Sequence, residues 1–191
     1  MKLSGVPVYV AGKGMFATLA TTSFKTGVMH ILEKSGLGYD TRMAYYAKQY
    51  PELTFERLSR MICDPIEYYD RDWPEYQKQH AGTANPDMLA VDFFLPRDQQ
   101  FRERAVGGII GFHEAGLGTG INCMRFLLGG KPILGFLPLE DNLAVNRDNI
   151  FQLVREYPEL FTLIRETDCI ETAIADWIVS LQSKAFTTTR T

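Results

Sequence analysis

Three glycines alternate in the stretch GLGTG, which runs from Gly116 to Gly120. Glycine lets backbone amides approach a ligand closely, and Thr119 adds a hydroxyl next to Gly118. The helix expected after this loop would direct its N-terminus at the same place and favour an anion there. The pattern predicts a cradle for a phosphate or another polar group. A turn that only joins a strand to a helix has the same composition, so both interpretations stand.

Two carboxylates accompany this loop, because Glu114 precedes it directly and Asp98 lies near the start of an expected helix. Either carboxylate could act as a general acid or base. His113 could transfer protons beside Glu114. Asp98 also has a structural interpretation, since it follows Pro96 and Arg97 where an aspartate is a favoured helix N-cap.

A second glycine-containing loop, GKGMF, follows the first apolar run of the chain. Gly12 and Gly14 would let the backbone approach a ligand, Lys13 could neutralise a phosphate, and Phe16 could stack on a base. A solvated lysine and a core phenylalanine are the alternatives. No GxxxxGK[ST] pattern occurs, so hydrolysis of a nucleoside triphosphate is not expected.

The elements that must position these loops are buried strands alternating with helices. Strands are expected at 6–12, within GGIIGF and within KPILGFLP, and helices at 21–34, from about Arg97, after the glycine loop, at 148–165 and at 171–184. This alternation predicts an α/β fold with a doubly wound, mostly parallel sheet and flanking helices. Ligands bind beyond the carboxyl ends of such strands, so both glycine loops should lie at one edge of the sheet.

Residues 39–88 do not fit the alternation and are interpreted as an insertion in a single domain spanning 1–191. The segment is rich in aromatic residues and in turns, which favours a lid or an oligomer contact, with a solvated insertion as the alternative. Four of its acidic residues, Asp64, Glu67, Asp70 and Asp72, form a cluster in the sequence, which a solvated acidic face explains better than a cation site. Their spacing does not match a calcium-binding loop, so no metal site is expected.

Composition narrows the class of protein. The chain has 191 residues and a net charge of −3, which argues against binding a nucleic-acid polymer. Its three cysteines form no zinc-binding spacing, and their odd number favours reduced thiols and a cytoplasmic location. The sequence contains no run of about 18 apolar residues, so no membrane span is expected. No cofactor is expected either.

Three stretches resemble the nucleoside 2-deoxyribosyltransferase family, including its deoxynucleoside 5′-monophosphate N-glycosidase branch. They are VYVAGKGMF, RDQQFRERAVGGIIGF and HEAGLGTGINCMRFLLGGKPILGF. Asp98 takes the place of the family's helix-opening aspartate. The resemblance implies a flavodoxin-like fold, a homo-oligomer and a small-molecule nucleoside or nucleotide as ligand. It also implies cleavage between the base and C1′ of a deoxyribose, with a glutamate as nucleophile and an aspartate that manages the proton of the leaving base.

The position of the family's nucleophilic glutamate is occupied by Asn122. An amide cannot act as a carboxylate nucleophile, although it can bind a sugar hydroxyl or a base edge. Three alternatives follow. Another carboxylate such as Glu114 takes over, or Asp98 or Glu114 activates water directly, or the protein is a sensor or partner-binding module that binds a nucleotide without turning it over.

Overall fold

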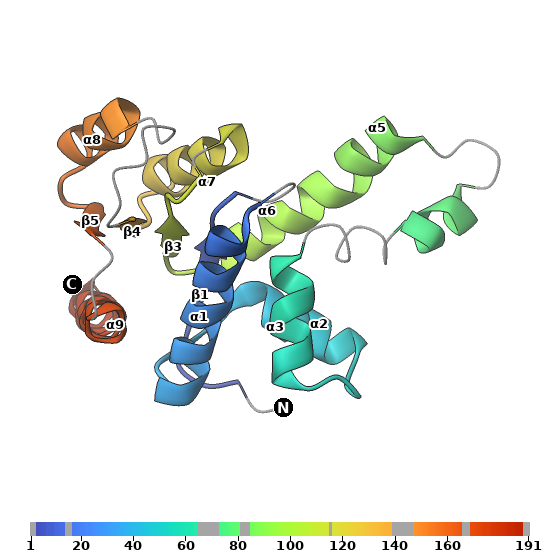
Figure 1. The fold of residues 1–191 in the computed structure, drawn as a ribbon, viewed down its shortest axis with the longest axis horizontal. Coiled ribbons are helices and arrows are strands. Elements are labelled where there is room, and N and C mark those ends of the chain that lie inside the picture. The colour runs from blue at the N-terminus through green and yellow to red at the C-terminus, as the bar shows by residue number, and fades with distance from the viewer. Residues whose placement is uncertain are drawn as a thin grey trace.

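A computed structural model describes residues 3–13, 17–64, 73–80, 85–114, 116–138, 147–165 and 169–188. Its five strands form one sheet in the order β2-β1-β3-β4-β5, and every pair is parallel (Figure 1). The strands are β1 (Val6–Ala11), β2 (Gly38–Asp40), β3 (Gly108–Gly111), β4 (Ile133–Leu137) and β5 (Phe161–Arg165). This is the strand order of flavodoxin-like sheets, so the predicted fold class is confirmed.

Helices cover both faces of the sheet. They are α1 (Leu19–Ser35), α2 (Thr41–Gln49), α3 (Phe55–Cys63), α5 (Pro86–Met88), η1 (Leu89–Phe94), α6 (Leu95–Arg104), α7 (Leu117–Leu128), α8 (Arg147–Glu156) and α9 (Ile170–Thr188). Residues 73–79 are also helical. No helix in the described part of the chain is long and apolar enough to cross a membrane.

Glycines in the strands show which helices lie on which face. A Cβ at Gly38 would lie 3.4 Å from side-chain atoms of both Leu32 in α1 and Ile178 in α9. A Cβ at Gly108 would instead meet the ring of Phe126 in α7 at 3.2 Å. Helices α1 and α9 therefore pack on one face, and α7 packs on the other. All residues of β3 and β4 are buried, as expected for strands covered on both sides.

Residues 39–63, the first part of the predicted insertion, belong to the core of the domain. Tyr39 and Asp40 lie in β2, and the side chains of Tyr46, Leu58 and Met61 are completely buried. Residues 65–72 and 81–84 lie outside the described residues. For the second half of segment 39–88, the role as a lid or an oligomer contact therefore stays a prediction.

A continuous helical rod runs from Pro86 through η1 to Arg104, and its far end projects away from the sheet (Figure 1). Helix α6 begins at Leu95, close to the start predicted near Arg97, but it continues the helical turns before it, so the interpretation of Asp98 as an N-cap was wrong. Pro96 does not break the rod because it follows a π-helical segment, in which the Leu95 amide donates to the carbonyl of Ala90. The wider turn leaves room for the proline ring.

The predicted helix at 148–165 is wrong in its second half. Helix α8 ends at Glu156, just before Pro158, and residues 161–165 form β5. Phe161 and Leu163 both lie against Gly135 of β4, as the two-residue repeat of a strand requires. The other predicted strands and helices are confirmed to within a few residues at their ends.

Candidate functional site

A cavity of about 510 Å³ opens at the carboxyl edge of the sheet. It is formed by the end of β1, helix α6 and the first turns of α7, with single side chains from α1, α2 and α3. The lining residues include Gly12 and Lys13 from the first loop and Gly116, Gly118 and Thr119 from the second. Both glycine loops therefore lie at one edge of the sheet, as predicted. Gly14 and Phe16 lie outside the described residues.

The glycines of the second loop have no packing reason to be glycines. Apart from the adjacent residues and the backbone of the same helix, no atom of the described residues lies within 4 Å of a Cβ built on Gly116, Gly118 or Gly120, and none of the three has a positive φ. Gly118 and Gly120 lie inside α7, where glycine costs about 1 kcal/mol relative to alanine. A purely structural turn would not need them, so the open space favours a ligand close to the backbone.

Thr119 supports the same interpretation. Its side chain is buried and lines the cavity, yet its hydroxyl has no hydrogen-bond partner among the described residues. The N-cap of α7 is Gly116, which has no side chain to accept from the first amides of the helix. A ligand with acceptor atoms could satisfy both the hydroxyl and these amides.

Asn122 and Asp98 reach the cavity from two neighbouring helices. Nη1 of Arg102, in α6, donates to Oδ1 of Asn122, in α7, at 3.2 Å. Asp98 lies one turn before Arg102, and its Oδ1 accepts from Nε and Nη2 of Arg97 at 3.1 and 3.0 Å. The structure thus brings the predicted site residues Asp98 and Asn122 to the same cavity, and the side chain of Arg102 connects α6 to α7.

Glu114 holds the first loop in place. Its carboxylate accepts from Lys13 Nζ at 3.1 Å, from the Thr18 amide and hydroxyl at 2.6 and 2.7 Å, and from the Thr21 hydroxyl at 2.9 Å. Burial alone would raise the pKa of Glu114, but these hydrogen bonds prevail and lower it to about 2. Glu114 is not among the residues that line the cavity. These contacts favour an anchoring role over proton transfer at neutral pH.

His113 lies on the α1 side of the sheet. Its ring packs against the ring of Phe24, with the centroids 5.0 Å apart, and it is not among the cavity-lining residues. Its predicted role in proton transfer has no support from this position.

The cavity wall is rich in cations although the whole chain is acidic. The charged lining residues are Lys13, Lys25, Arg42, Arg102, Arg125 and Asp98. Lys13 is paired with Glu114. In the described part of the chain, no carboxylate lies within ion-pairing distance of Lys25, Arg102 or Arg125. An anionic ligand would supply the missing negative charge.

The floor of the cavity is built on a buried ion pair. Arg42 donates from Nε and Nη2 to the two oxygens of Asp40 at 2.9 and 2.8 Å, and from Nη2 to the Val10 carbonyl at 2.5 Å. Its guanidinium lies 4.7 Å from the ring centroid of Tyr9. Burial raises the pKa of Tyr9, so its hydroxyl stays protonated and can donate to a ligand.

The cavity contains five polar or charged lining residues that were not predicted from the sequence: Tyr9, Lys25, Arg42, Arg102 and Arg125. Arg102 had a signal, since it lies one helical turn after Asp98. Lys25 had one too, because it interrupts an otherwise uncharged helix face that includes Thr21 and Val28. Within the described residues, no group of three or more potential ligands could hold a metal ion. Glu67, Asp70 and Asp72 lie outside those residues.

No protein-family model matches the chain, and no curated protein matches it at a significant level.

Proposed function

We propose that this protein binds a nucleoside 5′-monophosphate in the cavity and cleaves the bond between its base and its sugar. The sugar then passes either to water or to another base. The observation that carries the proposal is that residues assigned to such a site from the sequence line one cavity. They are Gly12, Lys13, Asp98, Gly116, Gly118, Thr119 and Asn122. The cations on its wall support a nucleotide rather than an uncharged nucleoside.

Each group would have a distinct part in the chemistry. The free amides at the start of α7 and the cations would bind the phosphate. Asn122 would donate to a sugar hydroxyl or to the base. Asp98 would manage the proton of the leaving base, because it is the one carboxylate among the described lining residues. Cleavage of such a bond develops positive charge at C1′, and a nearby carboxylate stabilises that charge.

A second function has its own support. Asn122 stands where the resemblance expects an acid, and its Oδ1 is held by Arg102. Glu114 is fully engaged with the first loop. A cavity arranged in this way is also suited to a sensor that binds a nucleotide without cleaving it.

The homo-oligomer stays a prediction. Three large apolar side chains that line the cavity are exposed, namely Leu95 at 51%, Leu117 at 83% and Ile121 at 44%. A second copy of the chain could cover them, and light scattering on the purified protein would measure its mass.

Release of free base separates the two functions. The protein is incubated with a panel of nucleosides and 5′-monophosphates, and free base is measured by chromatography. We expect base release from a 5′-monophosphate, reduced at least about 100-fold in Asp98→Asn. Asp148→Asn, on α8 and away from the cavity, is the matched control and should keep full activity. Saturable nucleotide binding without base release from any substrate would favour the sensor instead.

A further inference from the structure

Lys25 is a buried amine without an acidic partner. It lies in α1, its side chain is 4% exposed, and it lines the cavity. In the described part of the chain, Nζ has a single hydrogen bond, to the carbonyl oxygen of Lys13 at 3.5 Å, and no ion pair. Lysines buried to this extent are usually paired.

Packing alone does not explain a lysine at this place. Thr21 and Val28, which share its helix face, are buried, so a leucine or methionine would fill the same space without burying a charge. Arg42, itself buried, adds a second positive charge nearby. Keeping an ammonium group here costs free energy, and such a cost is typical of a residue retained for function.

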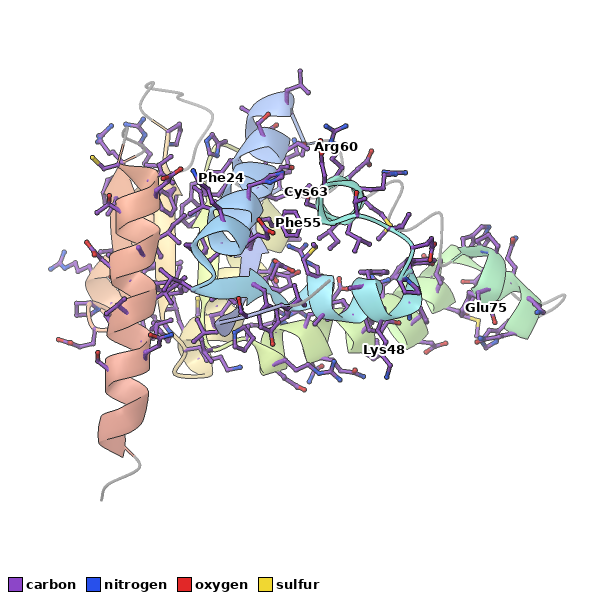
Figure 2. All side chains as sticks on the ribbon, turned by 90° about the horizontal axis from the view of Figure 1, so that it is seen from below. Phe24, Lys48, Phe55, Arg60, Cys63 and Glu75 are labelled. Carbon is purple, nitrogen blue, oxygen red and sulfur yellow. The ribbon has the colours of Figure 1, made fainter. Side chains whose placement is uncertain are left out.

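The surroundings of Lys25 favour its neutral form. Burial is the largest effect and lowers the pKa of Lys25 to about 8, and Arg42 acts in the same direction. Cys63, which lies on α3 beside α1, opposes this shift, as do Asp40 and Asp64 (Figure 2). Near neutral pH a larger share of the molecules than for an exposed lysine would therefore carry the free amine, which is nucleophilic.

We propose that Lys25 is the covalent nucleophile of this cavity and that its target is C1′ of the sugar of a nucleoside 5′-monophosphate. The proposal rests on the proposed function, because it requires cleavage of the bond between base and sugar. It supplies the nucleophile that Asn122 cannot be.

The step balances without a further co-reactant except water. The lone pair of Nζ forms a bond to C1′ while the bond from C1′ to the base nitrogen breaks, and its electron pair leaves with the base. A water molecule held by the Asp98 carboxylate donates a proton to that nitrogen, and the alkylated amine gives up a proton to the hydroxide that remains. The bond from C1′ to the ring oxygen then opens, that oxygen takes up a proton, and C1′ and Nζ are joined as an imine. Water hydrolyses the imine to the free sugar phosphate and the amine.

Reductive trapping tests the proposal. The protein is incubated with 2′-deoxynucleoside 5′-monophosphates, with and without cyanoborohydride, and base release and intact mass are both measured. We expect one reduced sugar phosphate to be attached, and peptide mapping should locate it on Lys25. Base release should rise as the pH rises through about 8 and then level off, because the neutral amine attacks.

Two substitutions separate a nucleophile from a simple anion contact. Lys25→Arg keeps a cation but cannot form an imine, and Lys25→Met keeps the packing without the charge. Both should lose base release at least about 100-fold. Lys48→Arg, exposed on α2, is the control and should behave as the parent protein (Figure 2).

The outcomes are distinguishable. Base release without a trapped adduct, retained within a few-fold in Lys25→Arg, would overturn the role of Lys25 and leave the proposed function standing. Loss of nucleotide binding in Lys25→Met but not in Lys25→Arg, again without an adduct, would make Lys25 an anion contact only. No base release by the parent protein would overturn the proposed function and this inference together.

Discussion

At the scale of single residues, the hydrogen bond between Arg102 and Asn122 fixes how the amide is presented. Arg102 has only donors, so Asn122 must turn its Oδ1 toward the guanidinium. Its Nδ2 donors are then left for a ligand in the cavity. The amide therefore acts in this arrangement as a fixed donor rather than as a remnant of a lost acid.

Asn122→Glu should create or raise base release by at least about tenfold. Arg102, whose Nη1 now lies 3.2 Å from Oδ1 of Asn122, would keep the new carboxylate ionised and oriented. Asn122→Gln has the same length without the charge and should show no gain. If the glutamate variant folds normally and its rate of base release is unchanged, the alignment of Asn122 with the family's nucleophile is wrong.

Glu114→Gln should lower the free energy of unfolding by about 1.5–3 kcal/mol at neutral pH, the range for hydrogen bonds to a charged group. The folded-state pKa of Glu114 is about 2, below its ordinary value of 4.5, so its stabilising effect is complete above about pH 5. The effect is lost as the pH falls from about 4.5 to 2. Urea unfolding of both proteins at pH 7 and at pH 3 measures this.

The difference in unfolding free energy between Glu114→Gln and the parent protein should be smaller at pH 3 than at pH 7. An equal difference at the two pH values would mean that the hydrogen bonds of Glu114 do not depend on its charge. Glu171→Gln, at the exposed start of α9, is a matched control.

At the scale of elements, α6 is held to the sheet through its last turn. Lys131, just before β4, donates from Nζ to the carbonyls of Arg102, Glu103 and Ala105 at 2.9, 2.6 and 2.7 Å. Carbonyls at a helix C-terminus lack partners within the helix, and a cation there also favours the helix dipole. Because α6 carries Asp98 and Arg102, this single side chain also positions one wall of the cavity.

Lys131→Met should lower the free energy of unfolding by about 2 kcal/mol, since it removes charged hydrogen bonds that the methionine cannot replace. It should also increase hydrogen exchange at the end of α6 and weaken nucleotide binding. Lys34→Met, in the exposed last turn of α1, is the control for loss of a surface charge. Unchanged exchange in α6 would show that other contacts hold this helix.

The elements could be predicted where the signal is local. Apolar runs such as KPILGFLP identify buried strands, and glycines between strand and helix identify the loops. The errors arose where a proline was judged without its tertiary surroundings. Pro96 was taken to mark the start of a helix, but the π-helical segment before it accommodates the proline ring. The helix predicted through Pro158 instead ends before it, and β5 follows.

The cavity residues divide in the same way. Asp98, Asn122 and the two glycine loops could be predicted because motif order and spacing mark them. Arg42 and Arg125 could not, since nothing in their local sequence shows that they face the same space. They lie on α2 and α7, far apart in the sequence, and the parallel pairing of β1 with β3 brings these two helices to the same cavity.

At the scale of the whole molecule, the charge is distributed unevenly. The chain carries a net charge of −3, yet cations outnumber the carboxylate among the described lining residues of the cavity. A concave, partly apolar wall concentrates such a field, because the low dielectric of the protein screens it less than water does. The net negative charge of the chain would discourage polyanions, whereas one phosphate could enter the cavity.

This distribution predicts how affinity depends on phosphate and on salt. A 5′-monophosphate should bind at least about tenfold more tightly than its nucleoside at low ionic strength, about 1.4 kcal/mol. The difference in affinity should shrink in 0.5 M salt, where the screening length falls to a few Å.

Arg125→Gln should reduce the preference for the 5′-monophosphate over the nucleoside, because Arg125 is a lining cation without a carboxylate partner among the described residues. Arg155→Gln, exposed on α8, should leave it unchanged. Calorimetric titration of the parent protein and of both variants, with nucleoside and with nucleotide at low and high salt, measures these affinities. Equal affinity of the parent protein for nucleoside and nucleotide at low salt would mean that the cations of the cavity serve another ligand.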